Sequence, residues 1–376
     1  MDFSFTDEQR LLADTLSRFV SKEYGFEKRK AILAQPEGFS REVWRALADM
    51  GILGLPFAEE YGGIGGSAVD TMIVMNAIGA GLVVEPYLAT VVLAGGLIDA
   101  VGSEAQKQAL LPAIAEGRLV LAFAHGEPQA RYEPRAVATQ ARRLGSRWAI
   151  NGEKAVVANG GQADRLVVSA RTSGAEGDAG GISLFLVERA AKGLAVRDYR
   201  TIDGLRAAEI QFFGAAGELL GGEGGAFDAI ERVTDAGIAA LCAEAVGAME
   251  ALNAQTLEYI KARQQFGQPI GRFQVLQHRA VDMMIHCEQS KSMAFLAAMR
   301  SQSADAAERR RAASAAKVHI GRSGRFVAQS AIQLHGGMGM TDELAASHYA
   351  KRLTMINFQL GDVEHHLDRF IKEPAS

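Results

Sequence analysis

The sequence contains little cysteine: Cys242 and Cys287 are the only two thiols among 376 residues. Both lie within apolar patterns of helical spacing, and no C-x-x-C pair occurs. The adjacent pair His365-His366 has no further ligand-type residue at a metal-binding spacing. These absences argue against a disulfide framework and against a zinc site. We expect two buried free thiols in a reducing compartment and no bound metal.

Long apolar runs and an excess of basic residues are also missing. No apolar run is long enough to span a bilayer, and the N-terminus lacks the charged-then-apolar pattern of a signal peptide. Lys and Arg together number 40 against 44 Asp and Glu, a net charge of -4, which argues against nucleic acid as the main partner. We therefore expect a cytoplasmic protein that binds neither nucleic acid nor membrane.

Apolar residues make up 48% of the chain and charged residues 22%, values typical of a globular protein. A chain of 376 residues is long enough for two or three domains. Residues 1–119 carry helical periodicity: Thr6 and Gln9 form a predicted capping box, followed by Leu12 and Leu16 at helical spacing. This part predicts an N-terminal helical domain.

The periodicity changes between residues 120 and 222. Short segments rich in β-branched and apolar residues alternate with turns such as Asn151-Gly152. The predicted strands are Arg147–Ile150, Arg165–Ser169, Ile182–Val187 and Glu209–Phe213. We interpret this region as a small antiparallel β-barrel.

Helical patterns return over residues 223–376. The predicted helices run from Phe227 to about Arg263, from Arg272 to about Ser301, from Ala306 to His335, and from Thr341 to about Phe358. Long helices with short connections are expected to form an antiparallel four-helix bundle. The chain is thus predicted to be mainly α with a β domain: an N-terminal helical domain (1–119), a middle antiparallel β-barrel (120–222) and a C-terminal four-helix bundle (223–376).

The most informative stretch joins the first two of these C-terminal helices. A helix that ends near Arg263 places a guanidinium and the Gln265 amide beside its C-terminus, and Gly267 with Pro269 breaks the helix. A guanidinium can fork two phosphate oxygens, and an aromatic side chain such as Phe266 can pack on a flat base. The stretch is a candidate site for the pyrophosphate and adenine end of a nucleotide. From the residues alone, the alternative is a helix–turn–helix elbow with a solvated arginine.

Two motifs in this part of the chain resemble those of the acyl-CoA dehydrogenases. The first reads R-x-Q-F-G, then P-I, then F-Q-x-x-Q-H-x-x-x-D-M, and the second is QLHGGMGMTDE, from Gln333 to Glu343. The helices–barrel–helices order extends the resemblance over essentially the whole chain. It implies FAD as cofactor, with its adenine and pyrophosphate end held by Arg263, Gln265, Phe266, Phe273, Gln274, Gln333, Leu334, Gly336 and Gly337.

The resemblance also implies the reaction and the partners. Members of the family dehydrogenate an acyl-CoA thioester between its α and β carbons in fatty acid metabolism, and an electron-transfer flavoprotein is the implied electron acceptor. They assemble as dimers or dimers of dimers, with each FAD at a subunit interface. The isoalloxazine end of that FAD lies against the barrel of the other subunit, which also supplies the catalytic base.

The residues implied to serve the flavin ring are changed in this sequence. The family's T-E-P-x-A-G-S-D motif appears as GEPQAR, which keeps Glu127, Pro128 and Ala130. Val156 stands where a Trp usually packs by the flavin. Ala158 stands where a Thr hydroxyl usually bonds to it, and an alanine side chain can donate no such bond.

The catalytic base is changed as well. Leu360 occupies the position of the commonest catalytic glutamate, and Asp362 lies two residues further on. Ile230-Glu231-Arg232 resembles the L-E-R at which some members carry an alternative base, so Glu231 is the candidate catalytic residue. The competing interpretation is a glutamate that only stabilises the first turn of a helix.

An intact adenine side combined with a changed flavin-ring side resembles one subunit of the two-component acyl-CoA dehydrogenases, and most of all the small subunit of pimeloyl-CoA dehydrogenase. We therefore expect a subunit that works with a paralogous partner, which supplies the main catalytic base. Two alternatives stay open. One is an autonomous homo-oligomeric dehydrogenase that uses Glu231. The other is a flavin-free scaffold without redox chemistry.

Overall fold

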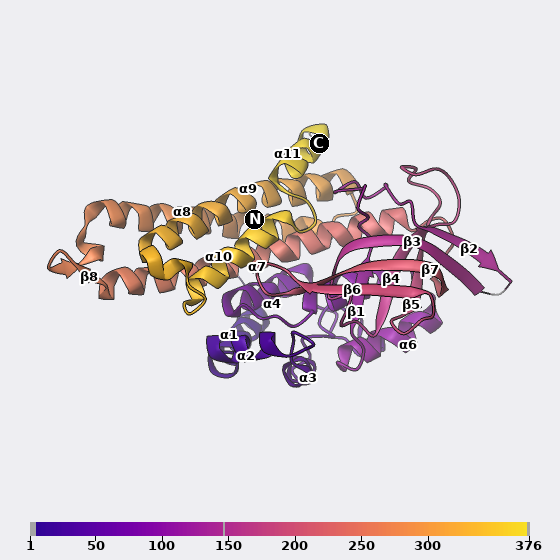
Figure 1. Cartoon of the computed structure of the whole chain (residues 1–376), viewed down its shortest axis with the longest axis horizontal. Coiled ribbons are helices and arrows are strands. Elements are labelled where there is room, and N and C mark those ends of the chain that lie inside the picture. Colours follow the sequence, from indigo (N-terminus) through magenta and orange to yellow (C-terminus); the bar gives the residue numbers. More distant parts are fainter. Residues whose placement is uncertain (1–4, 146, 374–376) are drawn as a thin grey trace. The chain divides into compact units, whose positions relative to one another are not determined.

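The structure, a computed structural model, describes residues 5–145 and 147–373 (Figure 1). The chain divides into two compact units. The first comprises Met1–Ile32, Ala68–Val84 and Ile238–Ser376, and the second comprises Leu33–Ser67 and Glu85–Gly237. The domain boundaries predicted from periodicity, near residues 119 and 222, stay predictions.

Helices build the first unit. They are α1(Asp7–Glu23), most of α2(Phe26–Ala34), α4(Ala68–Gly81), the larger part of α7(Phe227–Ala262), α8(Gln274–Ser301), α9(Ala306–His335), α10(Ala345–Phe358) and α11(Val363–Lys372). Helix α9 packs against α8, α10 and α11, and α4 packs against α1 and α8. The capping box predicted for α1 is confirmed, since Thr6 and Gln9 each bond the other's backbone N–H.

The four predicted C-terminal helices are confirmed, with small corrections at their starts. Helix α8 begins at Gln274 rather than Arg272, because a short 3-10 turn, η3(Ile270–Arg272), precedes it and Phe273 is extended. Helix α10 begins at Ala345 rather than Thr341, because η4(Gly336–Met340) is a 3-10 segment and Thr341 is extended. Helix α11 was not predicted; Asp362 caps its N-terminus by accepting a hydrogen bond from the His365 N–H.

A buried ion pair ties α10 to α7. The Arg352 guanidinium donates two hydrogen bonds to the Glu244 carboxylate, through Nε at 2.5 Å and Nη2 at 2.8 Å. Both side chains are almost fully buried, so their charges compensate each other in a low-dielectric environment. Both predicted free thiols are confirmed as buried: Cys242 lies in α7 and Cys287 in α8.

The second unit contains the β-barrel. Its strands are β1(Leu121–Ala124), β2(Gln140–Leu144), β3(Arg147–Ala158), β4(Arg165–Arg171), β5(Ile182–Glu188), β6(Leu194–Arg200) and β7(Arg206–Leu220). The order β4-β2-β3-β7-β5 closes on itself through the β4–β5 pairing, while β1 adds to β4 and β6 to β7. Most pairings are antiparallel; those of β4 with β1 and β2 are parallel. The predicted middle barrel is confirmed.

The barrel is filled by small and branched apolar side chains together with a few aromatic ones. Ile150, Leu166, Phe185 and Ile210 belong to its core and are fully buried. Helices α3(Arg41–Asp49), α5(Gly96–Val101) and α6(Glu104–Ala115), with the π-type helical segment η2(Leu88–Gly95) and the 3-10 turn η1(Glu59–Tyr61), complete this unit. Across residues 5–145 and 147–373, no helix is both long and apolar enough to cross a membrane.

Candidate functional site

The connection between α7 and α8 is a tight two-residue hairpin. Strand β8(Gln264–Gln265) pairs with β9(Gln268–Pro269), and the turn residues Phe266 and Gly267 both have positive φ angles, 54° and 78°. Positive φ at both central positions defines the mirror-image turn favoured in short hairpins. Phe266 is left 91% exposed, with its ring edge-on to Phe273 at 6.0 Å between centroids.

The end of α9 forms the second half of the site. Gly336 adopts φ 61° and ψ -143°, a conformation essentially restricted to glycine, and this ends the helix. A Cβ atom added to Gly336 or Gly337 would meet nothing within 4 Å, so the space above this turn is open. The glycines therefore let a ligand approach the backbone closely.

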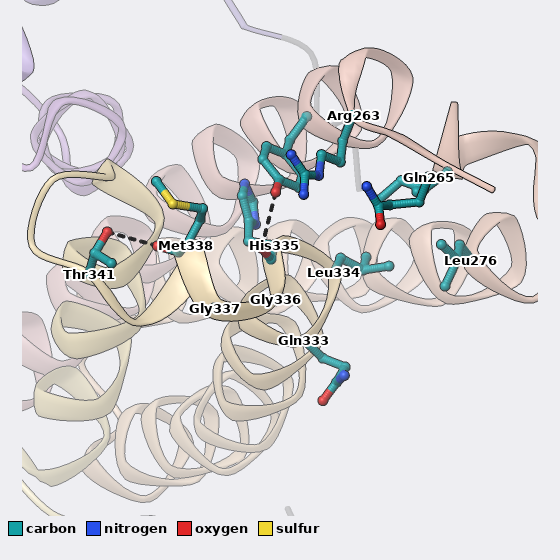
Figure 2. Close-up of a pocket in the computed structure, with 12 residues that line it drawn as sticks. Arg263, Gln265, Leu276, Gln333, Leu334, His335, Gly336, Gly337, Met338 and Thr341 are labelled. Atoms are coloured by element: carbon teal, nitrogen blue, oxygen red, sulfur yellow. Dashed lines mark hydrogen bonds between the residues drawn. The ribbon is translucent and has the colours of Figure 1, made fainter. Parts of the chain in front are cut away.

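These two ends line one pocket of about 590 Å³ in the first unit (Figure 2). Six of the nine predicted cofactor residues line it: Arg263, Gln265, Gln333, Leu334, Gly336 and Gly337. The other three, Phe266, Phe273 and Gln274, do not belong to its lining. Figure 2 shows Arg263, Gln265 and His335 on one side of the glycine turn and the Gln333 side chain extending away on the other.

The pocket has the donors that a phosphate group needs. Arg263 is exposed, and within the described part of the chain its guanidinium makes no hydrogen bond or ion pair. An unpaired guanidinium beside an open glycine backbone fits a pyrophosphate, and the pocket volume lies within the usual range for small-molecule sites. The residues present therefore fit the adenine and pyrophosphate half of FAD.

Sequence reasoning missed the residues that join the two halves of the pocket. Tyr259 lines it from one turn before Arg263, and His335 from the end of α9. Tyr259 could have been found because residues four apart share a helix face. His335 lies inside the second motif, but nothing local indicates that its side chain is buried in the pocket wall, with only 3% exposed. Ile270, Leu276, Met338 and Thr341 complete the lining.

The barrel keeps a buried ion pair at its changed motif. Lys154 Nζ lies 2.6 Å from Glu127 Oε1, with the side chains 0% and 2% exposed. Lys154 also donates to the His125 carbonyl oxygen and to Ser169 Oγ, each at 3.0 Å. Burial alone would raise the pKa of Glu127, but the charge of Lys154 and hydrogen bonds from Lys154, Gln129 and Thr139 lower it to about 2. Glu127 is thus a structural carboxylate.

Strand β3 bulges next to this ion pair. Its register with β7 shifts between Lys154 and Val157, and Val156 in the bulge has a φ of 51° and is 61% exposed. A β-branched residue at positive φ is strained. The conformation is nevertheless maintained, because the buried Lys154 and the Ala155 N–H, which donates to the Gly126 carbonyl, fix the strand on one side. The backbone at Val156 is therefore held in an unusual shape.

Replacing Val156 with glycine is expected to stabilise the second unit by about 1 kcal/mol, since relief of roughly 1–3 kcal/mol of left-handed strain exceeds the entropy cost of glycine. Urea unfolding followed by tryptophan fluorescence measures it, because Trp44 and Trp148 both lie in this unit. Val156→Ala is the matched control: it keeps a Cβ at positive φ and should gain less. A glycine variant no more stable than the alanine variant would contradict the strain at Val156.

The candidate base Glu231 is half-buried and lies in the part of α7 that belongs to the second unit. It is the fifth residue of the helix, in the second turn, so the first acidic residue at the helix start is Asp228 and not Glu231. The helix dipole acts mainly within the first turn. Stabilisation of a helix terminus therefore explains Glu231 less well than the sequence suggested.

Leu360, which the sequence predicted at the position of the commonest catalytic glutamate, lies in a tight turn and has an apolar side chain. Leu360 has a φ of 54°, and Lys317 Nζ donates to the carbonyls of Gln359 and Gly361, both at 2.6 Å. His366 Nε2 donates to the Leu360 carbonyl at 2.8 Å. Asp362, the nearby acidic candidate, caps α11 through the His365 N–H. This turn is firmly held but presents an apolar side chain.

Comparison with known proteins identifies the family. Family models match three consecutive parts of the chain: acyl-CoA dehydrogenase, N-terminal domain, over residues 6–118; middle domain, over 122–214; and C-terminal domain, over 224–373. A short-chain specific acyl-CoA dehydrogenase of Clostridium acetobutylicum is 30% identical over 359 residues, which cover 91% of each chain. The chain belongs to the acyl-CoA dehydrogenase family.

Two solved structures are similar over nearly the full length. Butyryl-CoA dehydrogenase of Megasphaera elsdenii superposes with a TM-score of 0.89 at 26% identity, covering 98% of each chain. The ChsE4–ChsE5 complex of Mycobacterium tuberculosis contains a chain with a TM-score of 0.89 at 27% identity, covering 100% of each chain. The predicted fold and FAD as the family's cofactor are confirmed, and the protein is an oxidoreductase acting on the CH–CH group of an acyl-CoA.

Proposed function

We propose that this chain is one subunit of a two-component acyl-CoA dehydrogenase of the pimeloyl-CoA small-subunit type, and that a paralogous partner supplies the main catalytic base. The asymmetry between its sites supports this proposal best. The pocket around Arg263 and the glycine turn keeps the residues of both motifs, whereas Leu360 has an apolar side chain and the nearby Asp362 caps α11. A similar chain occurs in a complex of two differently named proteins, ChsE4 and ChsE5.

In this proposal Arg263 would hold the pyrophosphate of FAD at a subunit interface, and Gly336 and Gly337 would let the dinucleotide approach the backbone. FAD, when bound, supplies the acceptor for the hydride that leaves the β-carbon of the acyl-CoA. A carboxylate of the partner takes the proton from the α-carbon, because that proton is too weakly acidic to leave without a base. This chain contributes the pocket in trans.

The remaining partners follow from the same assignment. We infer an acyl-CoA thioester as substrate, an electron-transfer flavoprotein as electron acceptor and a dimer-of-dimers assembly. A chain solved in work on the electron transferring flavoprotein of Acidaminococcus fermentans is similar to this one, with a TM-score of 0.91 at 28% identity, covering 99% of each chain. The acyl group is left open, because pocket shape drawn from several helices determines it.

The competing proposal is an autonomous homo-oligomer in which Glu231 is the base. The half-buried position of Glu231 in the second turn of α7, where the helix dipole gives it little, favours this candidate. A flavin-free scaffold is the third candidate; the changed Val156 and Ala158 motivate it, but the intact phosphate donors of the pocket argue against it.

Flavin stoichiometry and oligomer mass separate these candidates. The chain is expressed alone and its flavin absorbance is compared with total protein, then it is co-expressed with a neighbouring paralogue. The two-component proposal expects little FAD alone and bound FAD in a mixed assembly. About one FAD per chain in a homo-oligomer overturns the need for a partner. A mixed assembly that still lacks FAD would support the third candidate, a flavin-free scaffold.

Removing the guanidinium is the direct test of the pocket. Arg263→Ala is expected to weaken FAD binding by about 1.5–3 kcal/mol, the range for a charge-assisted hydrogen bond. Arg272→Ala, an exposed arginine of the same connection that does not line the pocket, is the control and should bind FAD normally. Titration of the FAD-depleted assembly measures both. Equal affinities in the two variants would show that Arg263 does not touch the cofactor.

A further inference from the structure

The two halves of the pocket are joined by one pair of residues in the first unit. The Tyr259 hydroxyl, in the last turns of α7, donates to the backbone carbonyl of His335 at 3.2 Å (the dashed line beside His335 in Figure 2). Their rings also touch, with centroids 4.4 Å apart and planes tilted by 33°. We call this pair the Tyr259–His335 latch.

The end of α9 explains why the latch forms there. His335 is the last residue of the helix, and the final carbonyls of a helix have no partner within it. The chain leaves the helix at Gly336 and continues into the 3-10 segment η4, which starts from His335. His335 is 3% exposed, and a buried carbonyl without a donor is costly. The Tyr259 hydroxyl adds a donor from another element at this helix junction.

The histidine ring is fixed from its other side. His335 Nδ1–H donates to the Ala331 carbonyl at 2.8 Å, which determines both the tautomer and the orientation of the ring. Burial lowers the pKa of His335 below its usual value, so the ring stays neutral at neutral pH. A fixed neutral ring is a firm surface for the tyrosine ring to pack on.

The sequence positions of the latch give it a role in the pocket. Tyr259 lies one turn before Arg263 on the same helix, and the Arg263 N–H donates to the Tyr259 carbonyl at 2.8 Å. His335 directly precedes Gly336 and Gly337. The latch thus connects a residue one helical turn before Arg263 with the residue that directly precedes the glycine turn. Among the lining residues that the structure describes, no other pair forms a side-chain hydrogen bond between these two ends of the pocket.

We propose that Tyr259 is a positioning residue for dinucleotide binding: through its latch with His335 it holds the Arg263 guanidinium at the distance from the Gly336–Gly337 backbone at which one pyrophosphate reaches both. This inference rests on the proposed FAD function. It concerns a residue that acts through Arg263 and not one that binds phosphate itself, because the Tyr259 hydroxyl is already committed to His335.

ADP is a suitable probe, because it carries the adenine and pyrophosphate half and needs neither the flavin ring nor a partner's barrel. Calorimetric titration of the full, flavin-free chain measures its affinity. Tyr259→Phe removes one hydroxyl and is expected to weaken ADP binding about three- to tenfold, the usual effect of one lost hydrogen bond. The matched control is Tyr349→Phe, whose buried hydroxyl donates to the Ala80 carbonyl in the same unit but away from the pocket. It should lower thermal stability and leave ADP affinity within about twofold.

A double-mutant cycle tests whether Tyr259 acts through Arg263. In an Arg263→Ala background, Tyr259→Phe is expected to change ADP affinity by less than about twofold, because there is no guanidinium left to position. Equal losses in both backgrounds would overturn the positioning role. If Tyr259→Phe does not fold, His335→Asn tests the ring contact instead: it leaves the backbone carbonyl that accepts from Tyr259 and keeps a δ-nitrogen donor, but it removes the ring, and its effect on ADP affinity should likewise depend on Arg263.

The outcomes separate this inference from the function on which it rests. A wild-type chain that binds no ADP overturns both the proposed cofactor pocket and the latch. Wild-type binding that is unaffected by Tyr259→Phe leaves the pocket in place and overturns the latch alone. Weakened binding in both Tyr259→Phe and Tyr349→Phe, in proportion to lost stability, also overturns it, because the effect would then be general loosening of the unit.

Discussion

Lys154→Met is expected to lower the free energy of unfolding of the second unit by about 3–5 kcal/mol, because it leaves the Glu127 carboxylate buried without its counter-charge. Glu127 also accepts hydrogen bonds from the backbone N–H groups of Ala138 and Thr139, so it cannot move out to water without breaking them. Urea unfolding at pH 7, followed through the fluorescence of Trp44 and Trp148, measures the loss.

The matched control is Lys261→Met. Lys261 also pairs with a glutamate, Glu258 at 2.8 Å, but both side chains are largely exposed, at 59% and 74%. Exposed pairs contribute about 0–1 kcal/mol. Overall stability of this variant, followed by circular dichroism, should therefore stay close to that of the wild type. If Lys154→Met lowered the free energy of unfolding by no more than Lys261→Met does, the predicted contribution of the buried pair would be wrong.

The loss of stability caused by Lys154→Met is expected to depend on pH. The folded pKa of Glu127 is lowered to about 2 from 4.5, so the stabilisation by this group is complete above pH 4.5 and is lost as the pH falls from 4.5 towards 2. In Lys154→Met the carboxyl is buried without its cation, and its pKa should rise above 4.5. In mild acid, Glu127 of the variant is then protonated and neutral, which removes the cost of an unpaired buried charge. The difference in stability between wild type and variant should be smaller at pH 4 than at pH 7.

The second large effect concerns the candidate base. Where the chain turns over acyl-CoA on its own, Glu231→Gln is expected to lower kcat/KM by about 10²–10⁴-fold, because a carboxamide cannot accept the α-proton. Steady-state dehydrogenation with an artificial electron acceptor measures it. Asp228→Asn is the matched control: Asp228 is the exposed acidic residue of the first turn of the same helix. It should cost a little stability and no activity.

The pair of variants decides between the two proposals for the base. Full activity of Glu231→Gln in an autonomous enzyme would remove Glu231 from the chemistry. In a mixed assembly with a paralogous subunit, the two-component proposal expects Glu231→Gln to stay close to wild type, since the partner's carboxylate takes the proton. A large loss in the mixed assembly would assign the base to this chain.

Local sequence signals determined the elements of the fold well. Thr6 and Gln9 indicated the start of α1, and Gly336 indicated the end of α9, because capping and positive-φ glycine act between residues close in sequence. Segments rich in branched residues predicted the barrel. The starts of α8 and α10 were misplaced, because 3-10 turns ahead of them share the composition of helix.

The sequence by itself also determined the family, and its two motifs carry the residues that we propose bind phosphate. Only the tertiary structure decided which of them meet: Arg263 and Gly336 are far apart in the chain and line one pocket, whereas Phe273 and Gln274, inside the first motif, do not line it. It also revealed the partners of buried groups, Lys154 for Glu127 and Tyr259 for His335. The physical reason is that periodicity and capping act within a few residues, while burial and pairing depend on contacts between segments whose separation in sequence carries no local signal.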